Sequence, residues 1–250
     1  MPKAGLLILM TDFGLHGPYL GQVRAVLARG APGVPIIDLF SDLPAYNPRA
    51  ASILVARYTE FIEAPAVFLC VVDPGVGGPR RPMIVKSRGR WFVGPDNGLM
   101  DRVSVGDAAA EFWEITLRPT GISDSFHGRD LFAPVAAHLV SGGAVETVAR
   151  PVANVRVGDV LELFEVIYID HFGNAMTGIL GASANQDLRL VIDKKTPSRL
   201  RYARTFCEAA PGETFWYVNA NGLVEIACNG GRAADKLCLE PGDQVDWRPQ

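Results

Sequence analysis

Apolar runs and helical repeats alternate along the first 150 residues. The apolar runs, which predict strands, cover residues 6–10, 35–40 and 66–72. The repeats between them, which carry apolar side chains at helical spacing, cover residues 19–29 and 49–62. This βαβ rhythm predicts an N-terminal α/β sheet domain over residues 1–150, Rossmann-like, with a mixed or mostly parallel sheet.

A third helix is predicted after Asp130. Aspartate is a frequent N-cap residue, because its carboxylate accepts hydrogen bonds from the first helical N–H groups. Apolar residues follow at helical spacing up to Leu139, and Gly142-Gly143 would end the helix. This helix completes the first domain.

After Pro151 the pattern changes to short strand-like runs separated by turns, with no clear helix between them. The runs cover residues 160–169, 188–192, 214–218, 223–228 and 244–247. We therefore expect a linker at residues 151–156 and a smaller, antiparallel, barrel-like β domain over residues 157–250. The fold class is α/β with this second β domain.

Composition narrows the classes of partner. The chain of 250 residues has a formal charge of −3 and no run of Lys or Arg that would follow a phosphate backbone, so no nucleic-acid partner is expected. Its cysteines lie far apart without a CxxC pair, which indicates neither a zinc site nor a disulfide framework. The apolar run at residues 6–10 is too short for a signal peptide or a membrane span. These features predict a cytoplasmic protein with no membrane partner.

Two acids directly follow apolar runs, where ligands bind in open α/β sheets. Asp12 follows residues 6–10, and Asp73 follows residues 66–72. The segment 73–80 holds three glycines and two prolines and ends in Arg80, which can turn back toward the carboxylate of Asp73. The alternative to a functional role is a structural one. The two acids would then form Asx turns or helix caps, and Arg80 would be a solvated surface residue.

Three further turns carry polar side chains. In residues 125–130, His127 does not cap the predicted helix and is a candidate for the active site. The alternative is a histidine with a purely structural role. Residues 93–98 contain Asp96 and the turn dipeptide Asn97-Gly98. Residues 170–174 form a plausible hairpin turn that offers an acid, an aromatic face and an amide.

Taken in order, six short motifs resemble the adenosine-forming S-adenosyl-L-methionine (SAM) hydrolases, also called SAM hydroxide adenosyltransferases, which are relatives of fluorinase and chlorinase. The resemblance spans nearly the whole chain. The motifs lie at Thr11-Asp12-Phe13-Gly14, Val72 to Gly77 with Arg80, Val93 to Gly98, Phe126 to Pro134, Asp170 to Asn174, and Asn219 to Asn229.

The resemblance implies hydrolysis of SAM to adenosine and L-methionine by attack of activated water on C5′. It matches Asp73, Arg80 and His127 to the water-activating triad. No cofactor and no metal are expected. The residues that it assigns to substrate binding are Asp12 at the ribose, Phe172 and Asn174 at the adenine, Asp170 at the methionine amino group, and also Phe13, Phe126 and Asn219.

The resemblance further implies a homotrimer, with each pocket formed by the first domain of one subunit and the second domain of its neighbour. One departure concerns Asn219-Ala220, where relatives commonly have Asn-Ser, so a hydroxyl that could help to hold the methionine end is missing.

Two other functions stay open at this point. In a metal-dependent phosphoesterase, Asp12, Asp73, Asp96 and His127 would bind divalent ions. In a non-catalytic adenosyl-binding protein, the triad would be a structural network of ion pairs.

Overall fold

The computed structural model describes residues 5–150, 162–192 and 198–248. The chain divides into two compact units, unit 1 (Met1–Asp159) and unit 2 (Val160–Gln250). The predicted linker at residues 151–156 and the predicted start of the second domain at residue 157 lie outside the described residues.

A seven-stranded mixed sheet, with strand order β2-β1-β3-β5-β4-β6-β7, forms the centre of unit 1. Its parallel strands are β1 (Leu6–Thr11), β2 (Ile36–Phe40), β3 (Ala66–Val71) and β5 (Arg90–Pro95). The antiparallel pairs add β4 (Pro82–Ser87), β6 (Glu111–Ile115) and β7 (Thr147–Arg150). The predicted mixed sheet is confirmed.

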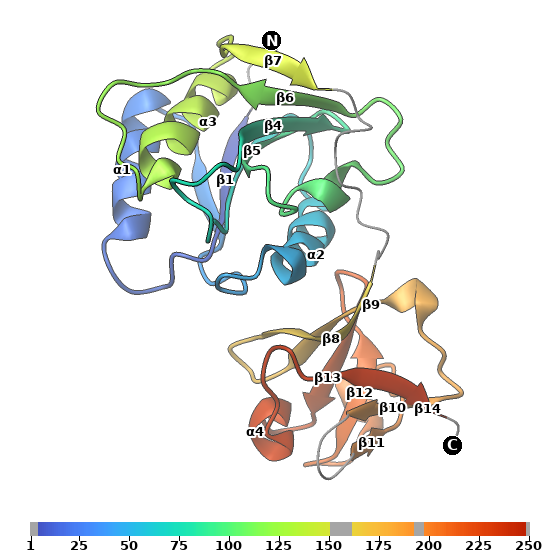
Figure 1. The fold of residues 1–250 in the computed structure, drawn as a ribbon. Helices are drawn as coiled ribbons and strands as arrows, with labels where there is room; N and C mark the ends of the chain where they lie inside the picture. The colour runs from blue at the N-terminus through green and yellow to red at the C-terminus, as the bar shows by residue number, and fades with distance from the viewer. Residues whose placement is uncertain (1–4, 151–161, 193–197, 249–250) are drawn as a thin grey trace. The chain divides into compact units, whose positions relative to one another are not determined.

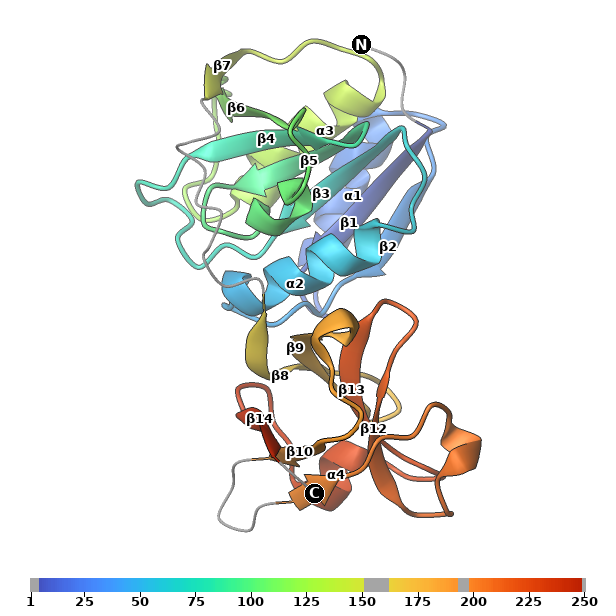
Figure 2. The same cartoon turned by 90° about the vertical axis from the view of Figure 1, so that its right-hand side faces the viewer.

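Helices cover both faces of this sheet (Figures 1 and 2). On one face lie α1 (Tyr19–Gly30) and α3 (Ala133–Val140), and on the other lies α2 (Pro48–Thr59). Alternate residues of β1, Leu7 and Leu9, join the buried cluster that α1 and α3 share, because strand side chains alternate between faces. β3 is buried along its whole length, as the apolar run predicts.

The predicted N-cap at Asp130 is wrong. The chain is already helical at Gly128, in a π-helical turn, Gly128–Phe132, that runs directly into α3. Because Asp130 lies inside this turn, its carboxylate accepts from the backbone N–H of Ser123, at 3.0 Å, in the preceding loop. Arg129 pairs with it at 2.6 Å, so Asp130 ties the loop to the helix.

Unit 2 contains two antiparallel sheets. The four-stranded sheet has the order β12-β13-β9-β8 and the three-stranded sheet the order β11-β10-β14. The strands are β8 (Leu163–Ile169), β9 (Ala175–Leu180), β10 (Arg189–Ile192), β11 (Ser198–Leu200), β12 (Thr214–Val218), β13 (Leu223–Cys228) and β14 (Val245–Arg248). The expected antiparallel domain is confirmed, but a five-residue helix, α4 (Ala233–Leu237), is too short to show a period and was missed.

Isolated bridges link the two sheets of unit 2. Glu165 pairs with Gln244, and Tyr202 pairs with Trp216. Within the described ranges of both units, no helix has the length and apolar character needed to cross a bilayer.

Candidate active site

Asp73, Arg80 and His127 lie in direct contact in unit 1. Nε of Arg80 lies 3.0 Å from each carboxylate oxygen of Asp73, and Nη2 lies 2.5 Å from Oδ2. The same Nη2 lies 2.7 Å from Nδ1 of His127. The side chains of Arg80 and Asp73 are only 10% and 6% exposed, so water screens their ion pair less than a surface pair. The predicted return of Arg80 toward Asp73 is confirmed.

The glycines of the segment 73–80 explain how two distant loops meet. Gly77 has a φ of +75°, a region that favours glycine, and a Cβ there would lie 2.6 Å from the carbonyl oxygen of Asp124. The segment therefore packs closely on the loop that leads to His127. This contact brings residues 47 positions apart in the chain within hydrogen-bond distance.

The contact with Arg80 determines the hydrogen-bonding role of His127. A guanidinium has N–H donors and no acceptor, so Nδ1 of His127 must accept. The neutral ring then carries its proton on Nε2. Burial lowers the pKa of His127, and the positive charge of Arg80 lowers the pKa further, while nearby carboxylates oppose this.

A cavity of about 120 Å³ adjoins these groups. Its lining residues come mainly from the ends of β1 and β3 and from the loop before α3, and they are Asp12, Phe13, Tyr46, Val71, Asp73, Val76, Ser125, Phe126, His127 and Gly128. Burial raises the pKa of Asp12, whose Oδ2 accepts from the backbone N–H of Tyr46 at 3.2 Å. The rings of Phe13 and Phe126 meet edge to face, with centroids 5.8 Å apart.

Tyr46 is a site residue that sequence reasoning missed. It lines the cavity, is 80% exposed and has a φ of +58°, which is uncommon for a residue other than glycine. Neither its exposure nor its backbone conformation leaves a pattern in the neighbouring residues, so nothing in the sequence pointed to it.

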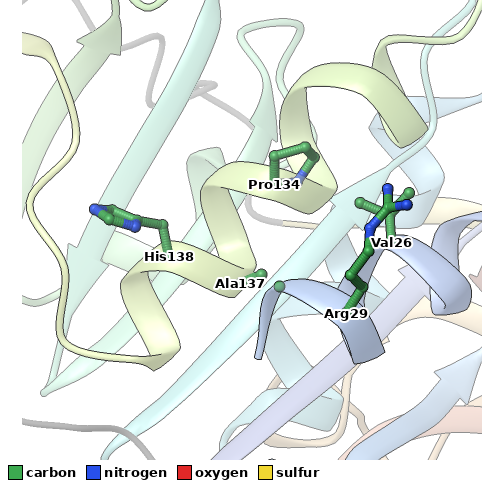
Figure 3. Close-up of a pocket in the computed structure, with 6 residues that line it drawn as sticks. Val26, Arg29, Pro134, Ala137 and His138 are labelled. Carbon is green, nitrogen blue, oxygen red and sulfur yellow. The ribbon is translucent and has the colours of Figure 1, made fainter. Parts of the chain in front are cut away.

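A second cavity of unit 1, about 260 Å³, lies between α1 and α3 (Figure 3). Arg29 and His138 are among its lining residues, but His138 points away from Arg29 in this view. None of the predicted site residues lines it.

The other predicted residues lie in unit 2. The turn between β8 and β9 is a hairpin, as expected, in which Asp170 accepts from the backbone N–H of Asn174 at 2.8 Å and from its Nδ2 at 3.0 Å. Phe172 at the tip is 71% exposed. Arg232 donates to the carbonyl of His171 and helps to hold the turn.

Asn219 makes its hydrogen bonds within unit 2. Its Nδ2 donates to Glu225 at 2.7 Å, and its Oδ1 accepts from the N–H groups of Asn221 and Leu223, both at 3.0 Å. Glu225 was not predicted as a site residue. An acid within the otherwise apolar run Leu223–Cys228 was the signal that could have found it.

The described part of the chain does not bring together a set of metal ligands. Among residues 5–150, 162–192 and 198–248, no group of three or more His, Cys, Asp or Glu side chains is arranged to hold a metal ion. The residues of the phosphoesterase alternative, which include Asp96, thus do not form such a group.

Two family models match this chain. The SAM hydroxide adenosyltransferase N-terminal domain matches residues 7–149, and the SAM hydroxide adenosyltransferase C-terminal domain matches residues 164–246. The chain belongs to the SAM hydroxide adenosyltransferase family.

Individual relatives are similar to this chain over most of their length. The (R)-S-adenosyl-L-methionine hydrolase of Salinispora arenicola is 38% identical, with 94% of each chain covered. The protein of the same name from Thermus thermophilus is 37% identical, with 94% of this chain and 96% of the relative covered. The crystal structure of an uncharacterized conserved protein from Thermotoga maritima matches with a TM-score of 0.80 and 31% identity, covering 97% of this chain and 99% of that chain.

Proposed function

We propose that this protein hydrolyses SAM to adenosine and L-methionine by attack of water on C5′. The observation that supports this proposal most strongly is that the guanidinium of Arg80 contacts both Asp73 and His127 beside a cavity. The similarity to relatives that are named (R)-S-adenosyl-L-methionine hydrolase supports the same substrate.

SAM already carries a good leaving group, because its sulfonium departs as neutral methionine. The reaction therefore needs an oriented nucleophile, and orientation alone can contribute up to roughly 7–11 kcal/mol. A new C5′–O bond forms as the C5′–S bond breaks, and the water proton must be removed. A buried cation with fixed hydrogen-bond donors stabilises the hydroxide character that develops on the water.

The geometry supports a separate role for each residue of the triad. Arg80 supplies the fixed cation. Neutral His127, with its proton on Nε2, donates a hydrogen bond to the water oxygen. Asp73 is then the group that accepts the proton from the water, because Nδ1 of His127 is occupied by Arg80.

The resemblance supports the binding roles. Asp12 holds the ribose hydroxyls with Phe13 and Phe126 beside it, and the hydrogen bond from the backbone N–H of Tyr46 keeps the Asp12 carboxylate in place. In unit 2, Phe172 and Asn174 bind the adenine, Asp170 binds the amino group of the methionine, and Asn219 is a further substrate-binding residue. The exposed ring of Phe172 suits stacking on a purine.

The same resemblance leads us to propose a cytoplasmic homotrimer in which unit 1, catalytic, and unit 2, substrate-binding, of neighbouring subunits share each site. Mixing Asp73→Ala chains with Asn174→Ala chains should then restore part of the activity that each variant lacks alone. No recovery after confirmed subunit exchange would overturn the shared site.

We also infer that unit 1 is Rossmann-like and unit 2 barrel-like, and the bridges from Glu165 and Tyr202 support the second of these inferences.

The function is tested by incubating purified protein with SAM in excess EDTA and identifying the products. We expect adenosine and methionine at the rate seen without EDTA. Activity lost with EDTA and restored by a divalent metal would instead support the phosphoesterase chemistry, and binding without turnover would support the adenosyl-binding protein.

A further inference from the structure

The guanidinium of Arg129 links three segments of unit 1. Its Nε lies 2.6 Å from Oδ1 of Asp130 and its Nη2 lies 2.8 Å from Oδ2, which makes a two-point ion pair. Its Nη1 donates at 2.9 Å to Oε1 of Gln22 in α1, 107 positions earlier in the chain. Its central carbon lies 4.9 Å from the centroid of the Phe126 ring, within the range of a cation–π contact. One side chain therefore joins α1, the π-helical turn and the loop before that turn.

Hydrogen bonds close the segment 123–130 on itself. The Asp130 carboxylate that pairs with Arg129 also accepts from the backbone N–H of Ser123 at 3.0 Å. The backbone N–H groups of Arg129 and Asp130 both donate to the carbonyl of Phe126 at 3.1 Å. His127 lies inside this closed segment, and the Arg129 guanidinium contacts the segment on both sides of it.

The position of His127 matters because its ring must reach an arginine of another loop. Nδ1 of His127 lies 2.7 Å from Nη2 of Arg80. The next residue, Gly128, leaves little room for movement, since a Cβ there would lie 2.9 Å from Cζ of Phe13. A displacement of about 1 Å at a catalytic group lowers turnover by roughly 10²-fold. Release of the segment would therefore affect turnover far more than it affects packing.

The ion pair of Arg129 contributes little to global stability. The side chains of Arg129 and Asp130 are 33% and 19% exposed, and water weakens a pair that is accessible to this extent. Arg201 and Glu213 of unit 2 form a pair of the same two-point geometry, with side chains 35% and 33% exposed. Loss of either arginine should thus lower stability by a similar small amount.

We propose that Arg129 is a positioning residue that holds His127 in contact with Arg80. Arg129 does not belong to the lining of the cavity beside the triad, so it acts through His127 and not on the substrate. The inference rests on the proposed function and deepens it, because it names a residue outside the cavity that keeps the water-activating triad assembled.

The test is a double-mutant cycle on SAM turnover with Arg129→Gln and His127→Ala. Arg129→Gln alone should lower kcat by roughly 10–100-fold, whereas the control Arg201→Gln should change it by less than about twofold, with similar urea midpoints for both variants. Added to His127→Ala, Arg129→Gln should lower kcat by less than about threefold, because the group that it positions is already gone. The same loss with and without the His127 ring would overturn the proposal.

Nitrogen-15 NMR of the His127 ring tests the same claim without turnover. The Nδ1 resonance should move toward that of a free imidazole in Arg129→Gln and stay in place in Arg201→Gln. An unmoved resonance in Arg129→Gln would overturn the proposal, whereas a wild type that cleaves no SAM would contradict the proposed function alone. If Arg129→Gln fails to fold, Arg129→Lys takes its place in both measurements with the same expected and contradicting results, since an ammonium lacks the planar fork that joins Asp130 to Gln22.

Discussion

Nη2 of Arg80 lies 2.7 Å from Nδ1 of His127, and this contact sets the protonation chemistry of the candidate site. A protonated His127 would present an N–H to a guanidinium that can only donate, so charging the ring breaks the contact. The assembled triad thus requires neutral His127, in agreement with the lowered pKa of that residue.

His127 should be neutral, with its proton on Nε2, at pH 7. Nitrogen-15 NMR of the labelled protein distinguishes the two tautomers and gives the titration midpoint, which should lie below the ordinary value of about 6.5. The histidine of the unfolded chain binds a proton more readily than His127 does in the folded protein. The contribution of neutral His127 to stability is therefore complete above the ordinary pKa of about 6.5 and is lost as the pH falls toward the folded-state pKa. The acid limb of kcat/KM should follow the same midpoint. A proton found on Nδ1 would contradict the assigned roles.

Arg80→Lys should lower kcat by roughly 10²–10³-fold, because an ammonium cannot contact Asp73, His127 and a water in the geometry of a planar fork. KM should change little. The matched control is Arg81→Lys, since the Arg81 side chain is half exposed and its Nε lies 4.0 Å from Oε2 of Glu114. If Arg81→Lys lost activity while Arg80→Lys kept the activity of the wild type, Arg81 and not Arg80 would be the arginine of the site.

Gly77→Ala should lower both activity and stability, since the new Cβ would meet the carbonyl of Asp124 and separate the two loops of the site. Gly33 is a matched control in unit 1, with a φ of +79° and no atom within 4 Å of its Cβ position. Gly33→Ala should cost only about 1–2 kcal/mol of unfolding free energy from the backbone conformation and leave kcat unchanged. Equal effects of the two variants on kcat would contradict the packing argument.

Phe172→Ala should raise KM for SAM by roughly tenfold or more with a smaller effect on kcat, because base stacking on an aromatic ring contributes about 1–3 kcal/mol. Phe61 in unit 1 is a comparable control, since it is 64% exposed and has no assigned role. Initial rates across a range of SAM concentrations give both constants. An unchanged KM in Phe172→Ala would exclude stacking by this ring.

Much of the fold could be predicted because the buried apolar positions recur along the sequence with the period of a strand or a helix. The strands Thr214–Val218 and Leu223–Cys228 coincide with their apolar runs, and α1 differs from its prediction by one residue. The strands β4, β5, β6, β7, β9 and β11 were missed, and the predicted turn at residues 93–98 begins inside β5. β7 shows why, because its exposed middle residues include Val148, so no alternation separates it from a loop.

The site was predictable where the chemistry follows a strand directly. Asp73 and Arg80 share one short segment, and glycines allow that segment to turn. The partners that depend on three-dimensional contacts were not predictable. Asp130 shows this, because its carboxylate accepts from the N–H of Ser123 in an earlier loop instead of capping its own helix. Glu225 shows it too, because it accepts from the hydroxyl of Tyr217 in the neighbouring strand β12.

The most direct test of the central claim follows the oxygen of the attacking water. In water enriched in oxygen-18, the label should appear in the 5′-hydroxyl of adenosine and not in methionine, as measured by mass spectrometry. His127→Ala should slow the reaction by roughly 10²–10³-fold, as the loss of one fixed hydrogen-bond donor does, without changing these products. Adenine or S-adenosylhomocysteine as the main product, or adenosine without label, would contradict attack of a triad-bound water on C5′.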